Sequence, residues 1–161
     1  MASYQTEVDR LIALANGCVG PGGSVDKAKQ AEIPAAVLQL CKCGVPGRLA
    51  AVEQSYRITD ALSQHNVVAQ VIRGDPARRP EDAIHSEALW LLANSSRQEH
   101  WDLLAEIAIV FDKGVFYEGV PRRELKRALA AAWRKASGAT RLNLEESLTR
   151  RDFRRMFGVW I

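Results

Sequence analysis

Two cysteines separated by a single residue, Cys41 and Cys43, are the first groups in the sequence with the chemistry to bind a metal ion. Zinc sites usually take cysteines two to four residues apart in a loop, with a second pair of ligands elsewhere in the chain. The pattern around Cys41 predicts a helix instead, on which positions i and i+2 point about 200° apart, so both sulfurs cannot reach one ion. We therefore predict no metal ion and no cofactor, and we interpret the cysteines as small apolar side chains.

An acid–base couple is the second possible chemistry, because His100 lies two residues before Asp102. An imidazole near a carboxylate can support general acid–base catalysis. The sequence offers no serine or cysteine in a recognisable nucleophile setting such as a Gly-x-Ser-x-Gly elbow, and the glycine-rich residues 20–24 lack the Gly-Lys-Ser/Thr ending of a phosphate loop. We therefore predict no catalytic residues and a protein that is not an enzyme. An unrecognised active site near His100 and Asp102 stays as the third-ranked alternative.

The strongest chemical signal is the concentration of arginine in the basic C-terminal segment 121–161. This segment holds 11 Lys and Arg residues against 4 Asp and Glu, so its net charge is +7 and that of residues 1–120 is −4. The cations of two successive expected helices each fall within an arc of about 140° on a helical wheel, opposite an apolar seam. The candidate binding residues are Arg122, Arg123, Lys126, Arg127, Arg134, Arg150, Arg151, Arg154 and Arg155. The apolar residues opposite them are Leu125, Ala128, Leu129, Ala132 and Ala136, then Phe153, Met156, Phe157 and Trp160.

The planar fork of arginine suits carboxylates and phosphates, which sets the kind of partner to expect. We predict a non-enzymatic helical interaction protein, an adaptor, assembly or regulatory factor, that binds a protein or acidic partner. The alternative is a nucleic-acid-binding protein that holds RNA or DNA by salt-dependent backbone contacts, without reading its sequence. A further alternative is that the basic face is only solvated. No membrane association is predicted, because the apolar sides of these helices are needed for the core.

Stacking on nucleobases would need exposed aromatic side chains beside the arginines. The sequence offers Phe116, Tyr117 and Trp160 as candidates near the basic helices. Core packing is the commoner fate of such residues, and we do not assign them to the binding site.

Composition and length favour one globular domain. The chain has 161 residues, of which 47% are hydrophobic and 25% are charged. At this length about 70% of the unfolded surface can be buried, so we predict a single helical domain over residues 1–161. No run of about 20 apolar residues is present, the first residues do not resemble a signal peptide, and three cysteines do not suit a disulfide framework. We accordingly expect a location in the cytoplasm.

Apolar residues recur at helical spacing along most of the chain. This pattern predicts an all-α fold of seven to nine helices, either an irregular bundle or a short helical solenoid. The expected helices span about residues 3–17, 26–32, 34–43, 48–64, 67–72, 80–93, 97–111, 121–137 and 143–157. Residues 67–72 are rich in β-branched side chains, but no partner strand is evident nearby, so a helix is favoured over a strand.

Local signals place the expected helix boundaries. Pro34 is expected at a helix start, where its missing N–H costs nothing. Ser96 and Asn143 are expected to be N-caps, each with a glutamate three residues later as the second half of a capping box. His65 and Asn66 are expected to interrupt the helical pattern.

Three stretches of the chain resemble one another, at spacings of about 30 and then about 40 residues, which is in the range of helical solenoids. The clearest is Glu87–Asn94, which reads Glu-Ala-Leu-Trp-Leu-Leu-Ala-Asn, and fainter echoes lie near residues 58–65 and 128–138. This segment resembles the inner-helix consensus of armadillo repeats, where an Ala-Leu-Trp-x-Leu-x-Asn run recurs. The resemblance covers about ten residues of one repeat, and it implies stacked helices with a concave face for peptide or protein binding. Unrelated amphipathic helices rich in alanine and leucine also look alike.

Overall fold

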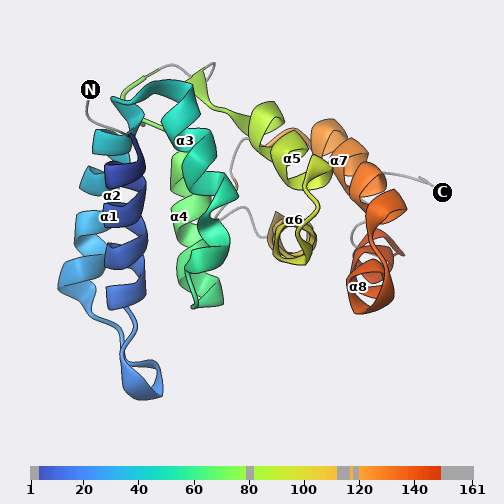
Figure 1. Cartoon of the computed structure of the whole chain (residues 1–161), viewed down its shortest axis with the longest axis horizontal. Helices are drawn as coiled ribbons and strands as arrows, with labels where there is room; N and C mark the ends of the chain where they lie inside the picture. Colours follow the sequence, from blue (N-terminus) through green and yellow to red (C-terminus); the bar gives the residue numbers. More distant parts are fainter. Residues whose placement is uncertain (1–3, 79–81, 112–116, 118–119, 150–161) are drawn as a thin grey trace. The chain divides into compact units, whose positions relative to one another are not determined.

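The computed structural model describes residues 4–78, 82–111, 117 and 120–149, and within them the protein is all-α (Figure 1). This described part contains eight α-helices and two short 3₁₀ helices, and its only β feature is an isolated bridge between Val19 and Val25. The predicted fold class and the expected number of helices are therefore confirmed. The internal contacts divide the chain into two compact units, Met1–Ile84 and His85–Ile161, and each is described by itself. The single domain over residues 1–161 stays a prediction.

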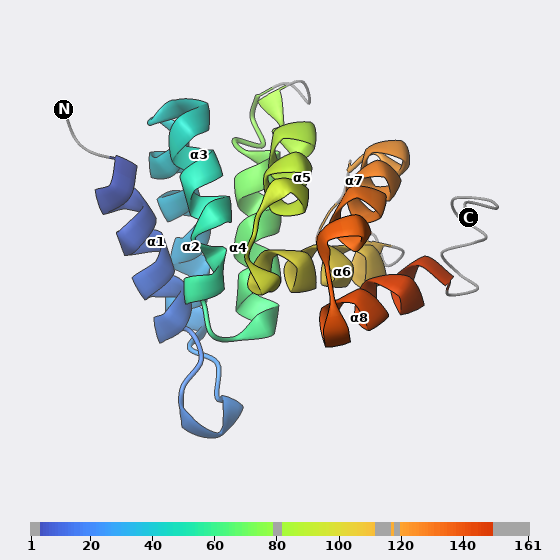
Figure 2. The ribbon, with the colours of Figure 1, turned by 45° about the vertical axis from the view of Figure 1, so that its right-hand side comes forward.

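The first unit contains four α-helices: α1 (Tyr4–Gly17), α2 (Lys27–Cys41), α3 (Gly44–Glu53) and α4 (Ala61–Arg73). The helix α1 packs against α2 and α3, and α4 packs against α2 and α3 (Figures 1 and 2). The buried residues of α1 are Val8, Leu11, Ile12 and Ala15. Their spacing puts one apolar stripe on α1, so the core of this unit follows directly from the sequence pattern.

The predicted break before Pro34 is wrong, because α2 runs through it from Lys27 to Cys41. Pro34 lies on the exposed side of α2, where water can solvate the carbonyl that loses its helical N–H partner. Ile33 and Val37, before and after Pro34 in the sequence, are both buried, so one apolar face continues past the proline. Asp26 caps the start of α2, since its side chain accepts a hydrogen bond from the backbone N–H of Lys29 at 3.1 Å.

The single helix predicted over residues 48–64 is also wrong, because this region contains the end of α3 and the start of α4. Residues 45–47 already lie inside α3, and a 3₁₀ helix at Ser55–Arg57 follows. Asp60 then caps α4 by accepting from the backbone N–H of Ser63 at 2.9 Å. Residues 67–72 are helical, as favoured, but His65 and Asn66 continue α4 instead of interrupting it.

The second unit contains α5 (His85–Asn94), α6 (Gln98–Phe111), α7 (Arg122–Lys135) and α8 (Gly138–Thr149). The helix α5 packs against α6 and α7, and α8 packs against the same two helices (Figure 2). The armadillo-like segment and its fainter echo lie at different positions relative to the helices. Residues 88–94 of the segment lie inside α5, whereas residues 58–60 of the echo near 58–65 precede α4. The resemblance stays a prediction.

Two predicted helix starts in the second unit are wrong, those of α5 and α8. The helix α5 begins at His85, five residues later than expected, and residues 79–81 lie outside the described part. Before α6, which begins at Gln98, Ser95 Oγ accepts from the backbone N–H of Arg97 at 3.0 Å, a bond of the turn that precedes the helix. Asn143 lies inside α8, which begins at Gly138, because that glycine adopts φ 59 and lets the chain turn directly from α7.

A buried arginine donates hydrogen bonds to carbonyl groups at the carboxyl end of α4. Arg48 of α3 is 6% exposed, and its guanidinium donates to the carbonyls of Val71, Ile72 and Asp82 at 2.8–3.0 Å. The negative end of the helix dipole and these carbonyl oxygens stabilise the buried charge. Gly74 follows α4 with φ 78 and ψ −146, and a Cβ atom there would lie 2.6 Å from Arg48 Nη2. The close approach of Arg48 therefore requires glycine at position 74.

The exchange Gly74→Ala is expected to lower the free energy of unfolding by about 3 kcal/mol, because it forces a glycine-only backbone conformation and displaces the Arg48 guanidinium. The control is Gly22→Ala, at φ 73 and ψ 12 with no atom within 4 Å of the new Cβ, for which a loss of about 1 kcal/mol is expected. Urea denaturation followed by circular dichroism measures both. Equal losses would contradict the packing of Arg48 against Gly74.

His65 makes the first unit sensitive to mild acid. It is 6% exposed on α4, and burial lowers its pKa below the ordinary value of 6.5. The unfolded chain therefore binds a proton near pH 6.5, before the folded chain does, and the free energy of unfolding falls as the pH is lowered below 6.5, by at most about 1.4 kcal/mol per pH unit. In His65→Gln this part of the pH dependence should vanish in urea titrations at several pH values. An unchanged pH dependence in this variant would disprove the role of His65.

Candidate functional site

The helix α7 separates its side chains into two opposite faces, as the sequence pattern predicts. The buried face consists of Leu125, Ala128, Leu129 and Ala132, and Ala136 directly after the helix is buried as well. On the opposite face four arginines are exposed and one lysine is partly exposed. These five residues, which we call the α7 cationic face, are Arg122, Arg123, Lys126, Arg127 and Arg134.

Three members of the α7 cationic face form a row along the helix. Arg123, Arg127 and Arg134 fall within about 40° on a wheel of 100° per residue. At a rise of 1.5 Å per residue, the row from Arg123 to Arg134 is about 16 Å long. A row of this length can contact several anionic groups of an extended partner at once.

Carboxylates neutralise this face only in part. Glu124 approaches Arg127 at 3.9 Å, and its other oxygen accepts a hydrogen bond from Trp90 Nε1 of α5 at 3.3 Å. The Arg127 guanidinium also lies over the Trp90 ring, 5.9 Å from its centroid. In the part of the chain that the structure describes, no carboxylate forms an ion pair with Arg123, Lys126 or Arg134. Their charges are therefore open to an external anion.

The start of α7 carries positive charge against the usual preference of helices. Arg122 and Arg123 lie in its first turn, where the backbone N–H groups already give the helix end a partial positive charge. Pro121 at the N-cap provides no side-chain acceptor for these N–H groups. Cations at this end of a helix typically cost a few tenths of a kcal/mol each, and Glu124 in the same turn offsets part of that cost. The dipole and the two arginines together attract anions.

One lysine of α7 has a structural task and does not belong to the cationic face. Lys135 Nζ donates to the carbonyl of Ala93 at 3.3 Å and to Asn94 Oδ1 at 3.2 Å. Both acceptors lie at the carboxyl end of α5, where a cation suits the helix dipole. Lys135 therefore stabilises the packing of α5 against α7.

The other half of the predicted basic site cannot be placed. Arg150, Arg151, Arg154 and Arg155 lie outside the described residues, as do Phe116 and Trp160. The remaining aromatic candidate, Tyr117, is buried, and burial raises the pKa of its hydroxyl. It does not lie on the surface and is not available for stacking.

Sequence reasoning missed an aromatic residue on the cationic side of α7. Trp133 is partly exposed, and the guanidinium of Arg141 from α8 lies over its ring, 4.1 Å from the centroid. A signal was present, because Trp133 falls between Arg122 and Lys126 on the helical wheel. The missing information was the turn at Gly138, which brings Arg141 back over the ring.

The cysteines and histidines do not gather into a metal site. Within the described residues, no three His, Cys, Asp or Glu side chains are close enough together to hold a metal ion. Cys18, Cys41 and Cys43 are free thiols, and burial raises the pKa of the Cys18 and Cys41 thiols. The thiolate form is therefore disfavoured at both positions.

The structure gives His100 and Asp102 different hydrogen-bond partners. His100 is buried, and its Nδ1 pairs with the hydroxyl of Ser95 at the start of α6. Asp102 accepts a hydrogen bond from Thr140 Oγ1 of α8 at 3.2 Å. The first bond links α6 to the residue Ser95 that precedes it, and the second joins α6 to α8.

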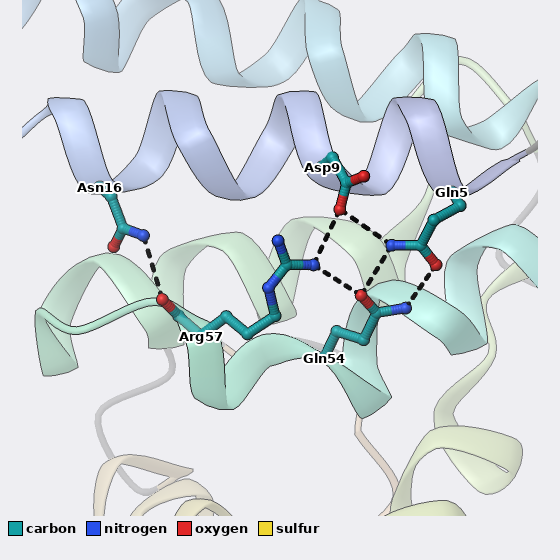
Figure 3. Close-up of polar contacts among 5 residues, drawn as sticks. All are labelled: Gln5, Asp9, Asn16, Gln54 and Arg57. Atoms are coloured by element: carbon teal, nitrogen blue, oxygen red, sulfur yellow. Dashed lines mark hydrogen bonds and ion pairs between the residues drawn. The ribbon is translucent and has the colours of Figure 1, made fainter.

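The densest polar cluster of the first unit joins α1 to the segment after α3 (Figure 3). Arg57 Nη1 donates to Asp9 Oδ1 at 2.8 Å and to Gln54 Oε1 at 2.7 Å, and Gln5 contacts both acceptors. Asn16 donates to the backbone carbonyl of Arg57 at 3.0 Å. The hydrogen bonds from Arg57 and Gln5 hold the pKa of Asp9 below its usual range. Because its donors and acceptors are paired with one another, we interpret this cluster as a structural link between α1 and the segment after α3.

Comparison with known proteins adds no relative. No protein-family model, curated protein or solved structure matches the chain. Among the described helices, none combines the length and the apolar character needed to cross a membrane.

Proposed function

We propose that this chain is a non-enzymatic interaction protein, an adaptor, assembly or regulatory factor, that binds an acidic partner through the α7 cationic face. One observation carries the proposal: α7 buries its apolar face while Arg122, Arg123, Arg127 and Arg134 are exposed on the opposite face. The row of guanidinium groups can bind carboxylates or phosphates in a bidentate manner. The three free thiols suit a reducing compartment, and we place the protein in the cytoplasm on that ground.

The fixed orientation of α7 supports this proposal. Its buried seam, the Trp90–Glu124 hydrogen bond and the Lys135 contacts to α5 together set which side of the helix meets water. A partner therefore meets a helix face whose orientation is set by the fold before binding. Because the face is exposed, its attraction for anions should weaken as salt concentration rises.

The double variant Arg123→Gln and Arg134→Gln tests the proposal. It removes two exposed charges that form no ion pair with a carboxylate in the described part of the chain, and we expect about fivefold to thirtyfold weaker binding to a labelled poly-glutamate peptide or to heparin. The control is Lys27→Gln with Lys42→Gln, which changes the net charge equally at exposed positions of α2 and the residue after it. Fluorescence anisotropy at several salt concentrations measures both. If the two pairs weaken binding equally, or if the wild type binds neither polyanion, the proposal fails.

Removing the carboxylate at Glu124 should have the opposite effect. Glu124→Gln is expected to tighten polyanion binding about twofold to fivefold, because Arg127 is then no longer neutralised, while the amide oxygen can still accept from Trp90. Glu7→Gln is a matched control, since Glu7 also lies in the first turn of a helix and pairs with the arginine three residues later. The same anisotropy titration measures both variants. Weaker binding by Glu124→Gln would contradict the location of the site.

A further inference from the structure

The contact between Trp133 and Arg141 places a guanidinium group against an aromatic ring on the second unit. The guanidinium carbon of Arg141 lies 4.1 Å from the centroid of the Trp133 ring, which places the cation directly above the aromatic face. Trp133 comes from α7 and Arg141 from the first turn of α8, so the turn around Gly138 creates the pair. Arg141 itself is exposed, and Leu142 beside it is 66% exposed.

This pair lies on the same side of α7 as the α7 cationic face. On the helical wheel Trp133 falls within the arc of the α7 cationic face, between Arg122 and Lys126. It is two helical turns, or about 10 Å, beyond Lys126 along the axis, and Arg134 is its neighbour in the chain. One surface of the second unit thus offers guanidinium and ammonium groups next to an aromatic plane.

The combination distinguishes between the anionic partners that the proposed function allows. An acidic peptide needs only the cations, and it gains nothing specific from an aromatic plane. A nucleic acid carries anionic phosphates and planar bases in alternation, and bases stack on tryptophan rings and on guanidinium planes. Bases in a duplex are already stacked on one another, whereas those of a single strand are free to stack on the protein.

We propose, on the basis of the proposed function, that the second unit binds single-stranded nucleic acid, with phosphates on the α7 cationic face and a nucleobase stacked at the Trp133–Arg141 pair. The contacts to phosphate make the binding depend on salt. The stacking contact adds affinity for any base and gives little sequence preference, since every base has an aromatic face.

A comparison of three probes of equal length tests the proposal. These are an oligothymidylate of about twelve nucleotides, its abasic analogue with the same phosphate charge, and the corresponding duplex. The wild type should bind the oligothymidylate at least about fivefold more tightly than the abasic strand or the duplex, as one stacked base predicts. Equal affinity for the first two probes, tighter binding of the duplex, or tighter binding of poly-glutamate than of the oligothymidylate would overturn it.

Variants at Trp133 separate stacking from charge. Trp133→Leu should abolish the preference for the oligothymidylate over the abasic strand and leave abasic binding within about twofold, whereas Trp133→Phe should retain the preference. Arg123→Gln with Arg134→Gln should weaken both strands alike and preserve their ratio. A wild type that binds abasic strand and poly-glutamate without preferring bases would refute the stacking proposal alone, and one that binds no polyanion would refute the proposed function as well. Preference retained in Trp133→Leu would place the stacking site elsewhere.

Discussion

The burial of small and aliphatic side chains along one face of α7 fixes the rotation of that helix, and the surface of the second unit depends on this rotation. Ala128 and Ala132 have little bulk, so the neighbouring helices can approach closely, while Leu125 and Leu129 supply the apolar area. A turn of about 100° around the helix axis would bury guanidinium groups without partners, at a cost of several kcal/mol each. The same packing that stabilises the unit therefore determines where its positive charge is displayed.

A comparable constraint operates in the first unit, but there the arginine is inside. Arg48 donates to three carbonyls around the end of α4, so a charge that elsewhere in this chain faces water is here satisfied by backbone oxygens. The two arginine environments have opposite consequences. Arg48 stabilises the connection after α4, whereas Arg123 and Arg134 are exposed and form no ion pair with a carboxylate in the part of the chain that the structure describes.

Much of the fold follows from periodicity, and the errors have local causes. The buried stripes of α1 and α7 were predictable residue by residue, because each repeats at helical spacing without interruption. The break predicted at Pro34 is wrong because an exposed proline can be tolerated within a helix whose neighbouring residues Ile33 and Val37 are well buried. At Asp60 the capping residue was present in the sequence, but the apolar spacing continued past it and concealed the boundary.

Only part of the candidate site could be predicted from the sequence. The cationic residues of α7 could be grouped from the sequence because they share one helix, and a wheel needs no tertiary information. The Trp133–Arg141 pair joins two helices, so its prediction required the geometry of the turn at Gly138. A glycine with positive φ indicates that a chain reverses there, but not which side chains meet as a result.

The division of the chain at Ile84 has a spectroscopic consequence. All four tryptophans, at positions 90, 101, 133 and 160, belong to the second unit, and all three cysteines, at positions 18, 41 and 43, belong to the first. Intrinsic fluorescence therefore reports on residues 85–161, while the rate of thiol labelling reports on residues 1–84. Unfolding followed with both signals in the unmodified protein compares the cooperativity of the two halves directly, without inserting a probe.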